Sequence, residues 1–134
     1  MMYNEKVLNE FFNPQNVGVI KGASGKGKVV SPINREIMKL YIQVEKGTVV
    51  DAQFQTFGCV ASIAVSSVAA RLVKGKTIEE VKQITAKDIL AELGELPENK
   101  MYCLDLIEQT IKDAVESLDK KSNKGKKNID DDID

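Results

Sequence analysis

At 134 residues, the chain is long enough to fold as one domain with a single hydrophobic core and too short for two ordinary domains. Its hydrophobic fraction of 43% and charged fraction of 29% are typical of a soluble globular protein. The formal net charge of −1 provides no overall basic surface, so the composition excludes general binding to nucleic acid or to an anionic membrane.

No segment resembles a secretory signal or a membrane span. The first residues, MMYNEKVLNEFF, contain acidic side chains and lack a sustained apolar segment. No apolar run approaches the roughly 20 residues that cross a bilayer. We therefore expect a cytoplasmic protein with no membrane partner, in which the two cysteines are reduced thiols rather than a disulfide.

The N-terminal half predicts a short helix followed by three strands. Apolar residues at helical spacing indicate a helix over residues 4–12, which Asn13 and Pro14 end. Residues 15–27 (QNVGVIKGASGKG) are rich in glycine and have no periodicity, which is typical of a mobile connection. Alternating apolar residues predict strands over 26–30, 36–45 and 49–56, with a tight turn at Lys46 and Gly47 between the last two.

The C-terminal half predicts helices only. Small apolar residues over 59–73 predict a helix that packs very close to its neighbours. Thr77 with Glu80 predicts a capping box that opens a helix over 77–84, and further helices are expected over 88–93 and 100–118. Because the strands precede the helices, the expected fold class is α+β, a small three-stranded antiparallel sheet with helices packed on one face.

The last residues differ in composition from the rest of the chain. Residues 120–134 (KKSNKGKKNIDDDID) form a basic block followed by an acidic block, with almost no apolar content. We therefore expect one domain over residues 1–119 and a disordered charged tail over 120–134. The basic block could contact an acidic partner or RNA, but a solvated tail is the simpler interpretation, and nucleic acid is not an expected partner.

The two cysteines occupy similar places in the predicted fold. Cys59 follows a glycine at a strand-to-helix turn, and Cys103 lies near the start of the last predicted helix. A helix N-terminus favours a thiolate and directs backbone N–H groups toward a ligand. Free cysteine is also common as a small buried hydrophobic residue. The residues alone leave both interpretations open.

Seven segments in order along the chain show a family resemblance. They are residues 3–7 (YNEKV), 13–18 (NPQNVG), 37–40 (IMKL), 51–59 (DAQFQTFGC), 62–64 (SIA), 72–76 (LVKGK), and Leu96-Pro97 ahead of Cys103. On these segments the sequence resembles the IscU / NifU N-terminal family of iron–sulfur cluster assembly scaffolds. The resemblance implies an antiparallel sheet with helices against one side, in agreement with the fold class expected above.

The resemblance also implies a ligand set, which this chain retains in part. The family pattern has three cysteines, an aspartate two residues after the first, and commonly a histidine before the third. Laid on this sequence, the second and third cysteines are Cys59 and Cys103, and the aspartate position holds Glu36. The first cysteine and the histidine are replaced by Asn34 and Tyr102.

From this comparison we expect Cys59, Cys103 and Glu36 to bind iron or an iron–sulfur cluster, either [2Fe–2S] or [4Fe–4S]. Asn34 is a poor ligand for cluster iron because its amide oxygen is neutral and hard. Tyr102 is an additional candidate ligand once its phenolic proton is lost. The same residues could bind zinc, but they do not complete a closed four-ligand structural site.

The implied function is binding and delivery, so no enzyme activity is expected. In the family, a cysteine desulfurase passes persulfide sulfur to the scaffold, iron enters, and the cluster is handed to an acceptor apoprotein. The implied sulfur acceptor here is Cys103. Two other interpretations stay open: a sulfur relay or modulator of the desulfurase that carries no cluster, and a structural adaptor with inert thiols. A homodimer would supply four thiolates from two chains.

Overall fold

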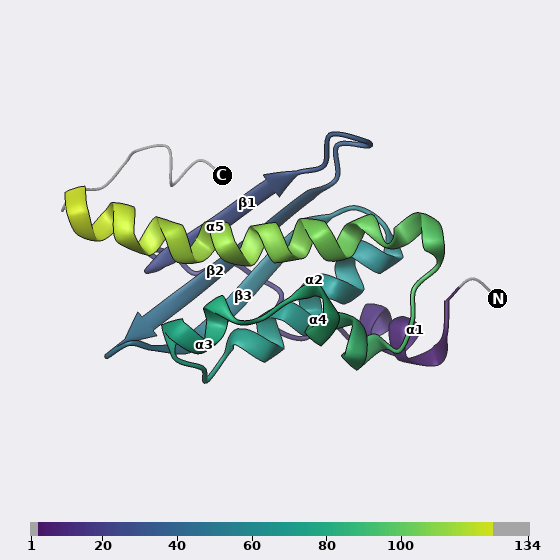
Figure 1. Ribbon diagram of the computed structural model, residues 1–134, viewed down its shortest axis with the longest axis horizontal. Coiled ribbons are helices and arrows are strands. Elements are labelled where there is room, and N and C mark those ends of the chain that lie inside the picture. The colour runs from purple at the N-terminus through teal and green to yellow at the C-terminus, as the bar shows by residue number, and fades with distance from the viewer. Residues whose placement is uncertain (1–2, 125–134) are drawn as a thin grey trace.

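The computed structural model describes residues 3–124 and confirms the α+β class (Figure 1). Three strands form one antiparallel sheet in the order β1-β2-β3. The elements are α1 (Glu5–Phe12), β1 (Gly25–Val30), β2 (Ile37–Glu45), β3 (Thr48–Phe57), α2 (Val60–Val73), α3 (Ile78–Lys82), α4 (Ala86–Leu93), the 3₁₀ turn η1 (Glu98–Lys100) and α5 (Tyr102–Lys124).

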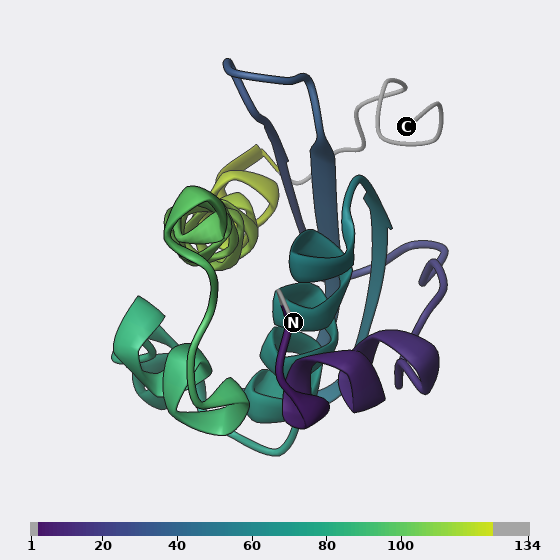
Figure 2. The same ribbon diagram turned by 90° about the vertical axis from the view of Figure 1, so that its right-hand side faces the viewer.

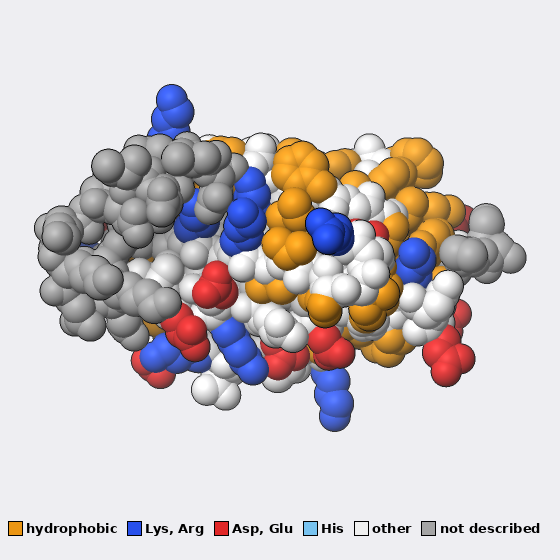
Figure 3. Space-filling view, turned by 90° about the horizontal axis from the view of Figure 1, so that it is seen from above, with side chains coloured by type: hydrophobic (Ala, Val, Ile, Leu, Met, Phe, Trp, Pro, Cys, Tyr) orange, Lys and Arg blue, Asp and Glu red, His pale blue; other side chains and the backbone are white. Residues whose placement is uncertain are grey.

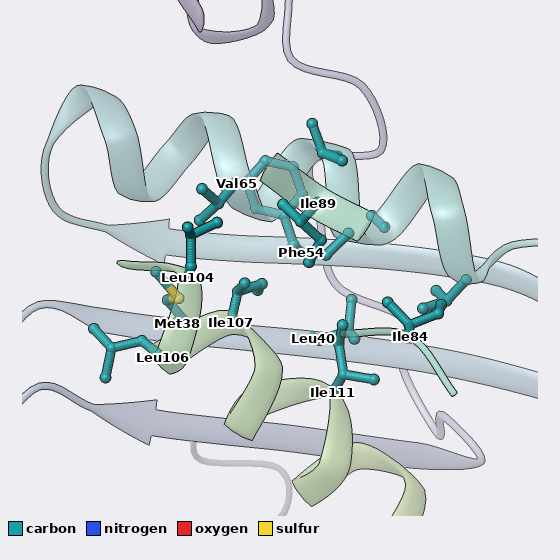
Figure 4. Close-up of a cluster of buried hydrophobic side chains, with 14 of the residues drawn as sticks. Met38, Leu40, Phe54, Val65, Ile84, Ile89, Leu104, Leu106, Ile107 and Ile111 are labelled. Atoms are coloured by element: carbon teal, nitrogen blue, oxygen red, sulfur yellow. The ribbon is translucent and has the colours of Figure 1, made fainter. Parts of the chain in front are cut away.

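The main helices pack on one face of the sheet, as expected (Figure 2). Helix α5 lies along β1 and β2, and α2 lies along β3, while α1 packs on the side of α2. Between these layers Met38, Leu40 and Phe54 of the sheet meet Val65 of α2 and Ile107 of α5 (Figure 4). All five side chains are buried, so the apolar face of the sheet is covered by the two longest helices.

The turn between β2 and β3 is the one that the sequence predicts. Glu45 pairs with Thr48, leaving Lys46 and Gly47 as a two-residue loop. Both loop residues have positive φ, 52° at Lys46 and 79° at Gly47, the combination of a type I′ turn. A turn of this type matches the twist of the flanking strands. The ends of all three strands agree with the predicted ends to within one residue.

The glycine-rich segment is more ordered than the sequence pattern indicates. Gly25 already belongs to β1, and Gly18 N–H donates to the Phe54 carbonyl oxygen (2.9 Å) at the free edge of β3. A Cβ on Gly27 would collide with the Thr110 carbonyl oxygen and lie 2.7 Å from the Ala114 nitrogen, both in α5. The glycines therefore allow α5 to rest directly on the strand backbone.

Helix α5 also covers the outer edge of β1. The Lys26 N–H donates to Ser117 Oγ (2.8 Å), and the Lys28 N–H donates to Asp113 Oδ2 (2.9 Å). These two N–H groups point away from β2, where an exposed edge strand would leave them available to another chain. Side chains of α5 thus accept hydrogen bonds from two N–H groups at the edge of β1, a protection that the sequence does not predict.

The predicted helices are present, with shifted ends. The capping box is confirmed, since Glu80 N–H donates to Thr77 Oγ1 (3.2 Å) and Thr77 N–H donates to Glu80 Oε1 (2.9 Å), but α3 ends at Lys82. Helix α4 begins at Ala86, earlier than predicted. Helix α5 continues to Lys124, so it enters the segment 120–134 that was expected to be disordered, and residues 125–134 lie outside the described part.

Helix α2 confirms the expectation that a run of small residues lies inside the molecule. Most of its residues are buried, including Ser62 and Ser66. Ser66 Oγ bonds both the Ser62 carbonyl oxygen (2.7 Å) and Thr56 Oγ1 (2.7 Å), so these hydroxyls are satisfied inside the core. Among the helices of residues 3–124, none combines the length and the apolar character needed to cross a bilayer.

Candidate functional site

Both cysteines and Glu36 meet at one end of the sheet. Cys59 is the N-cap residue of α2 immediately after β3, Cys103 lies in the first turn of α5, and Glu36 directly precedes β2. One ligand atom from each residue lies within 4.8 Å of the other two. Segments far apart in the sequence therefore deliver two sulfurs and a carboxylate to one place, as the family resemblance implies.

The two thiols differ strongly in environment. Cys59 is partly exposed, whereas Cys103 is fully buried. The hydrogen bond that the Cys103 thiol gives to Cys59 lowers the pKa of Cys59 far below that of an ordinary thiol, although burial opposes this effect. The same hydrogen bond, together with burial, raises the pKa of Cys103. The two thiols therefore titrate as a pair, and the lowered pKa belongs to the more exposed Cys59, which favours a thiolate there.

Glu36 is held by two hydrogen bonds on its two carboxylate oxygens. The Cys59 N–H donates to Oε2 (3.0 Å), and the Tyr102 hydroxyl donates to Oε1 (2.9 Å). Burial raises the pKa of this carboxyl, and the hydrogen bond from Tyr102 acts in the opposite direction. The bond from Cys59 N–H fixes the carboxylate at the N-terminus of α2, where negative charge is favoured.

Asn34 and Tyr102 form a hydrogen-bonded pair beside Glu36. The Asn34 amide nitrogen donates to the Tyr102 hydroxyl oxygen (2.8 Å), and the Glu36 N–H donates to Asn34 Oδ1 (3.2 Å). Burial raises the pKa of the Tyr102 hydroxyl, and the hydrogen bond to Glu36 raises it further. Tyr102 therefore donates a hydrogen bond to Glu36, and its role as an additional metal ligand stays a prediction.

A tight loop brings Asn34 to this position. The Ser31 N–H donates to the Glu36 carbonyl oxygen (2.7 Å) and the Arg35 N–H to the Ser31 carbonyl oxygen (3.0 Å), which closes residues 31–36 into a turn. Arg35 has a φ of 63°, a left-handed conformation that costs a non-glycine residue roughly 1 kcal/mol. The loop is thus strained at the residue between Asn34 and Glu36.

Sequence reasoning missed the role of Gly58. A Cβ at this position would lie 2.5 Å from Ser62 Oγ and 2.9 Å from the Glu36 carboxyl carbon. Only glycine therefore lets the Glu36 side chain lie against the turn that leads into α2. The glycine before a cysteine at a strand-to-helix turn was the one signal in the sequence, and it indicates close approach of another group.

Tyr3 and Lys100 are two further site neighbours that the sequence did not single out. Burial and then the negative charge of Cys59 raise the pKa of the Tyr3 hydroxyl. For Lys100, burial alone would lower the pKa, but attraction to the Cys59 thiolate and to Tyr3 raises it. The ammonium group of Lys100 therefore balances part of the negative charge that Cys59 and Glu36 place at this end of the sheet.

The unequal thiols predict an unusual pH dependence of alkylation. Because the pKa of Cys59 is lowered, iodoacetamide should modify Cys59 at pH 6 nearly as fast as at pH 8, whereas an ordinary thiol is only about 0.3% ionised at pH 6. Peptide mass mapping of the product checks the position. Cys103→Ala removes the S–H donor and should shift the Cys59 profile to higher pH. Preferential labelling of Cys103 in the wild type would contradict the assignment.

Comparison with known proteins places the chain in a family. The family model described as the NifU-like N terminal domain matches residues 2–125. The chain belongs to this family. It is 43% identical over 123 residues to the iron–sulfur cluster assembly scaffold protein IscU 1 of Archaeoglobus fulgidus, which covers 92% of this chain and 80% of that protein. The IscU scaffold of Escherichia coli K12 is 42% identical over 119 residues, covering 86% of this chain and 92% of that protein.

Solved structures support the fold of the NifU-like N-terminal family. A nitrogen-fixing NifU-like protein from Brucella abortus aligns with a TM-score of 0.66 at 22% identity, covering 92% of this chain and 96% of that one. A structure described as a putative assembly scaffold of the SUF system from Fervidobacterium islandicum aligns with a TM-score of 0.69 at 21% identity, covering 86% and 97%. At these identities the likeness concerns the fold alone.

The donor set fits a single metal ion in spacing and in chemistry. Two thiolates on one tetrahedral zinc or iron ion lie about 3.8 Å apart. The donor atoms of Cys59, Cys103 and Glu36 all lie within 4.8 Å of one another, so a small adjustment of the side chains would place them around one ion. Two sulfurs and one carboxylate leave at least one coordination position for another group. In this member of the NifU-like N-terminal family, the site therefore has the character of an open site.

Proposed function

We propose that the protein is a scaffold on which an iron–sulfur cluster is assembled, with Cys59, Cys103 and Glu36 as its iron ligands. The observation that carries the proposal is the convergence of these three donors within 4.8 Å at one end of the sheet. Relatives that match most of the chain are named as cluster assembly scaffolds. The cluster is then the cargo of a binding protein, and the chain needs no catalytic residue of its own.

Sulfur delivery follows from the state of the thiols. The Cys59 thiolate attacks the outer sulfur of a desulfurase persulfide, a new S–S bond forms at Cys59, and the desulfurase cysteine leaves as a thiolate. We propose Cys59 as the first acceptor because its pKa is lowered and its side chain is partly exposed. Cys103, the acceptor that the sequence resemblance implies, is fully buried and becomes accessible only if the start of α5 moves.

The remaining coordination positions need donors from outside this set. We propose that they come from a second copy of the chain or from the acceptor apoprotein during transfer. Ile33, Phe57 and Met101, each within two residues of Asn34, Cys59 or Cys103 in the sequence, are 75%, 57% and 39% exposed. On the face drawn in Figure 3, hydrophobic side chains lie next to one another over the right-hand part. Such a surface suits contact with a protein partner. Because the site needs reduced thiols, we propose that the protein works in the cytoplasm, where thiols are kept reduced.

Anaerobic reconstitution tests the proposal. Protein supplied with iron, cysteine and a cysteine desulfurase should develop the visible absorption of an iron–sulfur cluster, and Cys59→Ala and Cys103→Ala should each abolish it, because a thiolate ligand is lost. Glu36→Gln should reduce the yield. Circular dichroism of each variant checks that the fold is intact, and Ser67→Ala, in the helix that Cys59 caps but away from the site, serves as the control.

The same experiment separates the other interpretations when the sulfur is labelled. A colourless wild-type protein that carries labelled sulfur on a cysteine would make it a sulfur relay and overturn the scaffold proposal. A protein that gains neither the cluster absorption nor the sulfur label would support the third interpretation, a structural adaptor with inert thiols. Label on Cys103 in the Cys59→Ser variant would show that the start of α5 opens when the desulfurase binds.

A further inference from the structure

Asn34, Tyr102 and Glu36 form a closed ring of three hydrogen bonds beside the two thiols. The Glu36 N–H donates to Asn34 Oδ1 (3.2 Å), and the Asn34 amide nitrogen donates to the Tyr102 hydroxyl oxygen (2.8 Å). The Tyr102 hydroxyl in turn donates to Glu36 Oε1 (2.9 Å), so the ring starts at the backbone of Glu36 and returns to its carboxylate. Asn34 and Tyr102 stand where the family pattern has a cysteine and commonly a histidine, so that pattern does not account for the ring.

The direction of the hydrogen bonds around the ring is fixed by the groups that form it. A backbone N–H can only donate, so the atom of Asn34 that faces the Glu36 N–H is the amide oxygen. The amide nitrogen of Asn34 then faces Tyr102 and donates to it, which leaves the single hydroxyl proton of Tyr102 for Glu36. The asparagine thus makes Tyr102 a donor to the carboxylate.

The loop that carries Asn34 is itself held in place. Ser31, which is buried, donates its N–H to the Glu36 carbonyl oxygen (2.7 Å). The Ser31 hydroxyl oxygen accepts a hydrogen bond from the Ile33 N–H (3.2 Å), one residue before Asn34. A closed turn anchored on a buried residue therefore presents the Asn34 amide to Tyr102.

The carboxylate of Glu36 is restrained from three sides. Tyr102 donates to Oε1, and the Cys59 N–H donates to Oε2 (3.0 Å). The backbone of Gly58 closes the third side, since a Cβ there would lie 2.9 Å from the Glu36 carboxyl carbon. Each carboxylate oxygen has two lone pairs, so it can accept one hydrogen bond and still bind a cation. A carboxylate that is already oriented loses less side-chain entropy when it binds, which favours affinity.

We propose that Asn34 and Tyr102 are positioning residues that orient the Glu36 carboxylate toward a metal ion bound by the two thiols. This inference rests on the proposed function, because it takes Glu36 as a metal ligand. Groups that hydrogen-bond a metal ligand from outside typically contribute about 10-fold to 100-fold to metal affinity. The two positions that lack a family ligand then support a ligand that this chain keeps. A positioning role differs from a ligand role for Tyr102, because the hydroxyl that donates to Glu36 keeps the proton that a phenolate ligand loses.

A double-mutant cycle on zinc affinity tests the proposal on the full chain. Tyr102→Phe should lower the affinity for zinc by about 10-fold, and Asn34→Ala should lower it by a smaller factor. In a Glu36→Ala background, which lacks the carboxylate, Tyr102→Phe should have no further effect, because Tyr102 acts through Glu36. Competition with a chromophoric chelator measures each affinity. The matched control, Tyr41→Phe, removes the same hydroxyl about 16 Å along β2 from Glu36 and should leave the affinity unchanged.

The possible outcomes separate the positioning role from its alternatives. An equal loss of affinity in the wild-type and Glu36→Ala backgrounds would overturn the proposal. A phenolate-to-iron(III) charge-transfer band that disappears in Tyr102→Phe would then identify Tyr102 as a ligand instead. Zinc affinity unchanged by Tyr102→Phe would overturn the positioning role alone, whereas a wild-type protein that binds no zinc would contradict the ligand set of the proposed function as well.

Discussion

Replacing Gly27 by valine is expected to lower the free energy of unfolding by about 4 kcal/mol or more, a large share of the 5–15 kcal/mol typical of a domain. The new Cβ alone would collide with the backbone of α5 at Thr110 and Ala114, and backbone cannot move aside as a flexible side chain can. Helix α5 would have to lift from β1, which also breaks its contacts with the strand edge. Urea unfolding followed by circular dichroism measures the loss.

The neighbouring Lys28→Val variant is the control. It places the same side chain on the same strand, but on the face that points away from α5, where Lys28 is exposed. This variant should change the stability by less than about 1 kcal/mol. If Gly27→Val proved equally mild, α5 would not rest on the strand backbone, and the packing described for β1 would be wrong.

This close packing shows where sequence reasoning about the fold stops. The hairpin and the capping box were predicted because their signals are local, two residues at a turn and a threonine three positions before a glutamate. Gly25 and Gly27 are informative only through the α5 residues that they contact, Thr110 and Ala114, which lie more than eighty residues later in the chain. From the sequence alone, these glycines are indistinguishable from those of a flexible loop, which is how residues 15–27 were interpreted.

The site follows the same division. The family resemblance predicted that Glu36, Cys59 and Cys103 meet, and they do. It could not predict which thiol has the lowered pKa, since that depends on burial and on the hydrogen bond between the two thiols. Nor could it predict the hydrogen bonds from Asn34 to Tyr102 and from Tyr102 to Glu36. Asn34 and Tyr102 differ from the family pattern, so the pattern gives no information on their contacts.

Restoring the cysteine and the histidine of the family pattern at positions 34 and 102 should complete the ligand set and make the site bind metal tightly. In the Asn34→Cys, Tyr102→His variant, we expect the affinity for zinc to rise by about 100-fold or more, since a thiolate and an imidazole join two existing sulfurs. The geometry favours this outcome. The Asn34 amide and the Tyr102 hydroxyl are 2.8 Å apart, and the hydroxyl is 2.9 Å from Glu36 Oε1, so both side chains already border the ligands.

Competition with a chromophoric chelator measures the affinity, and sedimentation shows whether the zinc-bound species is a monomer. Tyr102→Phe is the matched control for the lost hydroxyl: it frees Glu36 Oε1 from its donor without adding a ligand, so it should not reproduce the gain. Tight binding confined to a dimer would mean that the strained loop at Arg35 prevents the third thiol from reaching the ion. Zinc affinity equal to that of the wild type would show that this end of the sheet cannot close around a metal, and the ligand role of Cys59, Cys103 and Glu36 would then need a partner chain to hold.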